Sequence, residues 1–154
     1  MRTELQVLNR LKDVIATQLN NWLKEDEENS GKLNPITKDN VIIDFPDPDH
    51  MPKSTVFYIE PETSDIEDLT SMADLEQMTV TVYIMCKRDK NEVLIQKVFG
   101  YFTALFALIR NNMTLDEFVD FTKITTMEFY PYVDATKGIS CVEATLVIQF
   151  EKPY

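Results

Sequence analysis

The side chains with the clearest chemical potential lie in one proline-rich stretch, where His50, the single histidine, follows Asp47 and Asp49. One histidine with two carboxylates could bind a metal ion, and a histidine beside an aspartate could activate a serine nucleophile. The sequence offers no CxxC, HExxH or paired-histidine spacing, and no nucleophile elbow accompanies His50. We therefore expect no metal, no cofactor and no enzymatic activity, and keep a hydrolase centred on His50 as an alternative.

A second chemically distinct group is a run of acids in the middle of the chain. The formal net charge is −11, and residues 25–76 carry fifteen acidic and only three basic residues. Its densest part has seven acids and no base: Glu60, Glu62, Asp65, Glu67, Asp68, Asp74 and Glu76. Such a chain is a poor candidate for coating duplex DNA or an anionic membrane, because both tasks need a basic face. Nothing in the spacing singles out a catalytic pair, so the run indicates either a solvated face or a charged contact surface.

Glycine and cysteine exclude further classes of protein. Glycine occurs only at positions 31, 100 and 138, which leaves no phosphate-binding loop. Cys86 and Cys141 lie far apart in sequence, which is typical of buried thiols in a reducing compartment. No basic-then-apolar leader opens the sequence, so secretion is not expected. The most apolar stretch, 98–109, would form a helix of roughly 18 Å, too short for a bilayer core of about 30 Å.

Apolar periodicity predicts the elements that must position these groups. An amphipathic helix is expected over residues 3–24, and a second, apolar helix begins behind a capping box at 89–92 and ends near Arg110. Strands are expected at 41–45, 55–59, 78–86, 123–132 and 141–151. Residues 60–74 are predicted to form a long polar connection, residues 114–120 one further turn of helix, and Gly138 a hairpin turn with positive φ.

Strict alternation assigns two faces to the later strands. Met78, Val80, Val82, Ile84 and Cys86 point one way, and Tyr83 and Met85 point the other. The expected order is therefore α-β-β-β-α-β-β in a single domain, 1–154, with an acidic arm at about 60–76. We expect a two-layer α+β sandwich in which a mostly antiparallel sheet carries the helices on one face.

The order of elements resembles one family. A leading amphipathic helix is followed by short strands split by a proline-rich loop. An alternating strand then ends in Cys86, Lys87 and Arg88, one apolar helix follows, and a final hairpin closes with Val147–Glu151. This pattern is similar to the tail-terminator, or tail-completion, proteins of long-tailed bacteriophages. Neck-ring and head-to-tail joining proteins share much of the same architecture.

The resemblance implies a structural virion protein, assembled in the bacterial cytoplasm, that forms a ring, commonly a hexamer. The ring would cap the tail tube and meet the head-completion or connector protein. Double-stranded DNA would pass through its hole without specific binding, and no membrane is involved. The candidate lining or inter-subunit residues are the seven acids of 60–76 together with Tyr83, Met85 and Tyr130.

An acidic DNA mimic is the alternative from another class. Such a protein would present carboxylates at phosphate spacing and thereby block an enzyme that binds nucleic acid. A mimic is expected to be a monomer or dimer, whereas a terminator assembles into rings, so the oligomeric state separates the two.

Overall fold

The fold, taken from a computed structural model, is described for residues 3–23, 33–70, 72–88, 94–134 and 138–153. The elements in chain order are α1 (Glu4–Gln18), β1 (Val41–Ile43), β2 (Thr55–Thr70), β3 (Ala73–Lys87), α3 (Leu94–Asn111), β4 (Phe121–Asp134) and β5 (Ile139–Pro153). Short 3-10 helices occupy Leu19–Asn21 and Lys38–Asn40. The predicted order of helices and strands is confirmed.

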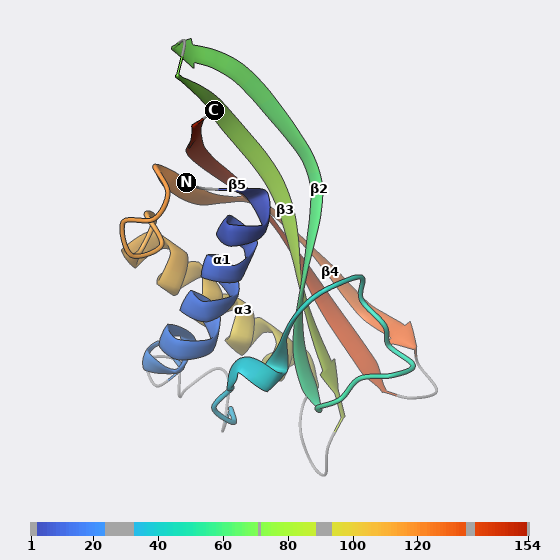
Figure 1. Ribbon diagram of the computed structural model, residues 1–154. Coiled ribbons are helices and arrows are strands. Elements are labelled where there is room, and N and C mark those ends of the chain that lie inside the picture. The colour runs from blue at the N-terminus through green and yellow to red at the C-terminus, as the bar shows by residue number, and fades with distance from the viewer. Residues whose placement is uncertain (1–2, 24–32, 71, 89–93, 135–137, 154) are drawn as a thin grey trace.

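The five strands form one sheet in the order β1-β2-β3-β5-β4. β1 runs parallel to β2, and every other neighbouring pair is antiparallel. Figure 1 shows α1 and α3 on the same side of the sheet, with the long β2–β3 hairpin extending past them. The molecule is thus the expected two-layer α+β domain, and no described helix combines the length and apolar character of a membrane span.

The core lies between the sheet and the two helices. Thr3 begins α1 with a reciprocal capping box to Gln6, which satisfies two backbone donors that a helix start otherwise leaves unpaired. The even-numbered residues of β3 from Met78 to Cys86 face the helices, as their alternation predicts. The residues of β5 in the same phase, from Val142 to Phe150, fill the same layer.

The acidic segment departs from its prediction. Residues 60–74 are not a loop, because β2 continues to Thr70 and pairs with β3 down to Ala73. The segment forms a strand without buried apolar side chains because β3 supplies its backbone hydrogen bonds, and β5 in turn pairs with β3 as far as Pro153. At about 3.3 Å per residue, Glu60 to Thr70 spans about 30 Å.

The segment after α3 is also different from the prediction. Leu115, Asp116 and Glu117 all have positive φ (49°, 60° and 64°), so 114–120 forms a left-handed turn and not a continuation of the helix. Side chains hold it there: the Asn112 carboxamide accepts from the Asp116 N–H, and Gln18 of α1 donates to the Asp116 carboxylate. Leu115 is buried, which fixes the turn against the core.

The two predicted turn signals have different outcomes. Gly138 has φ +63°, as predicted, and a Cβ there would also lie 3.2 Å from the Arg88 Cβ. The capping box expected at 89–92 falls outside the described residues.

Candidate functional site

The sheet face opposite the helices, called the open face below, gathers the four carboxylates of Glu60, Glu62, Glu128 and Glu143. The pairing register places Glu60 beside Thr81 on the next strand, and Tyr83 beside Glu143 on the one after that. On the outermost strand Glu128 lies directly opposite Glu143. The face carrying these acids therefore runs across β2, β3, β5 and β4.

Hydroxyl groups hold the open-face acids in place. The Tyr83 hydroxyl donates to Glu60 Oε2 at 2.6 Å, and the Thr81 hydroxyl donates to Glu62. The Tyr130 hydroxyl donates to Glu128. Within the described part of the chain no ion pair neutralises any of these carboxylates. The open face is accordingly a fixed negative surface.

The neighbouring negative charges raise the pKa values of groups on the open face. Burial, followed by the nearby charges of Glu128, Glu62 and Glu60, raises the pKa of Glu143. Burial and the hydrogen bond to Glu60 raise the pKa of Tyr83. The hydrogen bond to Glu128 likewise raises the pKa of Tyr130. Tyr83 and Tyr130 therefore keep their protons near neutrality and remain donors to the carboxylates.

One end of the open face is covered. A second, small apolar cluster lies beneath the proline-rich stretch, and Met51 packs against this cluster. Its buried members are Val56, Tyr58, Met85, Ile139 and Cys141. Met85 lies on the face opposite the helices, as its alternation predicts, but this cluster covers it and leaves it only 2% exposed. Burial also raises the pKa of Cys141 to about 12, so this thiol is unreactive near neutral pH.

A hollow of about 260 Å³ adjoins the uncovered part of the open face. It is lined by Pro46, Pro48, Tyr83, Met85, Tyr130, Cys141 and Glu143. Tyr130 remains exposed at its rim, and Tyr83 is half-buried. These two tyrosines keep the accessible positions that the sequence predicts for them.

The far end of the β2–β3 hairpin projects into solvent. All residues from 61 to 70 are exposed on both faces of the strand, and we call these the hairpin tip. Beyond Ile59 no described strand pairs with the outer edge of β2. Asp65, Glu67 and Asp68 lie here together with exposed Ile66 and Leu69.

Two acids of the predicted run do not lie on this exposed surface. Asp74 is half-buried, and Glu76 is completely buried on the helix side, where the Ser64 hydroxyl donates to Glu76 Oε2 at 2.8 Å. Lys152 Nζ lies 2.7 Å from a Glu4 oxygen and 4.0 Å from Glu76 Oε1. Glu76 Oε1 itself has no hydrogen-bond partner. The expectation that Glu76 lines a solvated surface is therefore wrong.

His50 sits in a solvated loop and not in a pocket. Its side chain is 82% exposed, and its Nδ1 lies 3.0 Å from the Asp47 carboxylate. Asp47 also accepts from the Asp49 N–H, which is a local turn interaction. Among the described residues no group of three potential ligands is close enough to hold a metal ion.

The sequence interpretation omitted Glu128 and Glu143 from the site. The alternation of the last strand places Glu143 on the face opposite the core, so that signal was present. What the sequence does not contain is the strand order, which places β5 and then β4 next to β3, so that their acids share one face with Glu60 and Glu62 of β2.

No family model matches the chain, and no curated protein matches it in sequence. Among solved structures it is similar to a chain from the virion of a native gene transfer agent particle. The two share 9% sequence identity with a TM-score of 0.40, over 87% of this chain and 92% of the other.

Proposed function

We propose that the protein is a structural virion component whose copies form a hexameric ring that caps a phage-type tail tube and joins it to the head connector. The observation that carries this proposal is the acidic, helix-free sheet face adjoining a projecting hairpin whose outer edge pairs with no described strand. Such a subunit offers one surface for a channel and another for its neighbours.

The open face suits the wall of a channel for DNA. Its four carboxylates meet no cation among the described residues, so a ring with these faces turned inward would present negative charge all round the hole. Like charge keeps phosphates from adhering, and DNA would therefore slide through without specific binding. The tyrosine and threonine donors hold three of these carboxylates in fixed positions along the wall.

The two outer strands support a closed ring. One sheet edge is the free part of β2, and the other is β4 at the opposite end of the strand order. Because these surfaces differ, contact between them is head-to-tail, and head-to-tail contacts close into rings when the rotation allows. Further partners, the tail tube protein and the head-completion protein, would meet the two rims of that ring.

Oligomeric state tests the proposal. The full-length protein, alone and mixed with tail tubes of its own virion, should give closed rings in native mass spectrometry and in negative-stain images. A protein that stays monomeric and ignores tail tubes would overturn the proposal.

The orientation of the open face can be tested with charge reversal. Glu60→Lys combined with Glu128→Lys should leave rings intact but make them retain linear duplex DNA at low salt, about tenfold or more above wild type, with release as salt rises. Fluorescence anisotropy of labelled DNA measures this. The matched control, Asp13→Lys with Glu117→Lys, makes the same charge change on exposed positions of other elements. Equal DNA retention by both variants would show that the open face does not meet the DNA.

The acidic DNA mimic has one specific observation in its favour. The open face carries carboxylates held by hydroxyl donors, which could present a fixed charge pattern to a basic enzyme. A mimic would be a monomer or dimer that binds such an enzyme tightly, so the ring assay also separates this function from the first.

A further inference from the structure

We infer that the hairpin tip of one copy docks in the groove between α3 and β4 of the next copy, which gives the ring its subunit contact. This inference rests on the proposed ring. It specifies which two surfaces meet, and it commits to a second copy of the same chain as the occupant of the groove.

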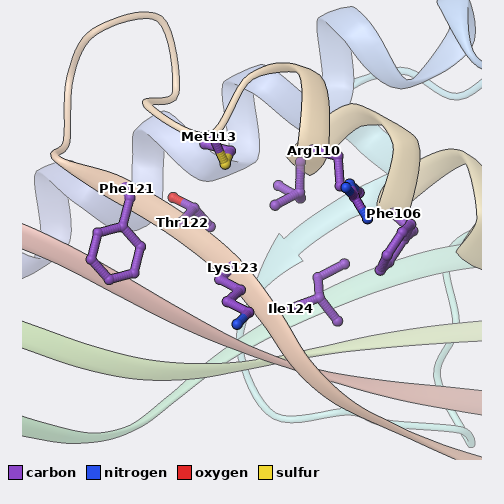
Figure 2. Close-up of a pocket in the computed structure, with 8 residues that line it drawn as sticks. Phe106, Arg110, Met113, Phe121, Thr122, Lys123 and Ile124 are labelled. Atoms are coloured by element: carbon purple, nitrogen blue, oxygen red, sulfur yellow. The ribbon is translucent and has the colours of Figure 1, made fainter.

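The groove is an apolar hollow of about 430 Å³ with cations beside it (Figure 2). It is lined by Phe106, Ile109, Arg110, Met113, Phe121, Thr122, Lys123 and Ile124. Phe106 is 38% and Met113 53% exposed, so the groove presents an apolar patch of the kind found at interaction sites. Arg110 and Lys123 are both exposed, and among the described residues neither forms an ion pair.

The hairpin tip has the complementary chemistry. Ile66 (53% exposed) and Leu69 (46%) offer apolar side chains, and Asp65 and Glu67 on the same strand offer negative charge. The tip also has a backbone edge without a described strand partner, as does the outer side of β4. The tip is therefore a strand with apolar and acidic side chains, and the groove has apolar and cationic side chains beside a strand edge with no described partner.

The same charges oppose symmetric pairing. Two tips brought edge to edge would place acids against acids, and two grooves would place Arg110 and Lys123 against their own copies. Like charges across an interface raise its energy, whereas tip against groove pairs opposite signs. Tip-to-groove contact is head-to-tail, which matches the requirement for a ring.

Charge reversal of each surface tests the contact. Arg110→Glu with Lys123→Glu reverses the groove, and Asp65→Lys with Glu67→Lys reverses the tip. At the concentration where wild type forms rings, each variant alone should show no ring in native mass spectrometry. Half-assembly of either variant should need about tenfold or more protein than wild type, because close interfacial charge pairs are worth more than the 1.4 kcal/mol that corresponds to tenfold. Mixing the two variants should restore rings that hold both in equal number, because each reversed tip then meets a reversed groove.

Controls separate this contact from general charge effects. Lys38→Glu with Lys53→Glu, and Asp13→Lys with Asp44→Lys, make the same charge changes at exposed positions elsewhere and should assemble like wild type. Circular dichroism confirms that every variant is folded. If both reversed variants form rings alone, or if the folded variants fail to co-assemble, the tip-to-groove contact is wrong and the proposed ring stands. If wild type forms no ring even with tail tubes, the proposed function falls and this contact falls with it.

Discussion

Replacing Phe57 with alanine should lower the free energy of unfolding by about 4 kcal/mol, because it leaves a large cavity where the sheet meets the helices. Phe57 is completely buried in the main core, and its ring meets the Tyr101 ring edge-on at 5.9 Å between centroids. Urea denaturation followed by circular dichroism measures the loss. A loss this large is a substantial part of the stability of an ordinary domain.

Phe45→Ala is the matched control for that experiment. Phe45 is 71% exposed, so its replacement should change the free energy of unfolding by less than about 0.5 kcal/mol. The two substitutions remove the same atoms, and only their surroundings differ. Similar losses for both variants would contradict the placement of Phe57 between β2 and α3.

The position of Phe57 also explains how one hairpin can be firm at its base and exposed at its tip. The first five residues of β2 are buried, whereas the ten from 61 to 70 are exposed. Apolar contacts therefore anchor the base, while the tip depends on backbone pairing with β3 and on side-chain hydrogen bonds such as that from Ser64 to Glu76. Few buried contacts mean a low local opening free energy, so the tip can adjust to a neighbouring surface without disturbing the core.

Alternation along single strands predicted most of the fold. Met78 to Cys86 and Val142 to Phe150 alternate because one face of each strand is buried, and both core faces are correct. That signal is absent from residues 60–70, where neither face is buried, and the segment was therefore predicted to be a connection. Its strand structure comes from pairing with a partner, which the local sequence does not record.

The candidate site was predicted less completely, for the same reason. Glu60, Glu62, Tyr83 and Tyr130 do gather on the open face, but Met85 and Glu76 are buried. Met85 is covered by a proline-rich stretch whose path depends on tertiary contacts. Glu76 falls on the helix side because it is in phase with Met78 and Val80, a phase that the charge count alone ignores.

Replacing Glu76 with glutamine should raise the free energy of unfolding at pH 7 by about 2 kcal/mol, the cost of a buried charged group with an unsatisfied oxygen. Burial, and then the neighbouring Glu4, raise the pKa of Glu76 above its ordinary value of 4.5. The glutamine amide keeps an oxygen that accepts from the Ser64 hydroxyl. It also supplies an N–H that can donate toward Glu4, whereas the ionised Glu76 has no donor. Thermal and urea unfolding from pH 4 to pH 8 measure the difference.

The sign of the pH dependence follows from the raised pKa. Glu76 favours the folded state below pH 4.5, and that contribution disappears as pH rises through its folded pKa, so wild type should lose stability over this range. Glu76→Gln should remove that loss and leave the opposite contribution of Glu4, whose pKa is lowered by its hydrogen bond to Lys152 and which stabilises the fold above pH 4.5. Glu67→Gln, on the exposed tip of the same hairpin, makes the same chemical change and should leave the wild-type profile unaltered. A Glu76→Gln profile that still falls with rising pH would mean that another carboxylate carries the buried charge, and Glu143, whose pKa burial also raises, is then the residue to replace.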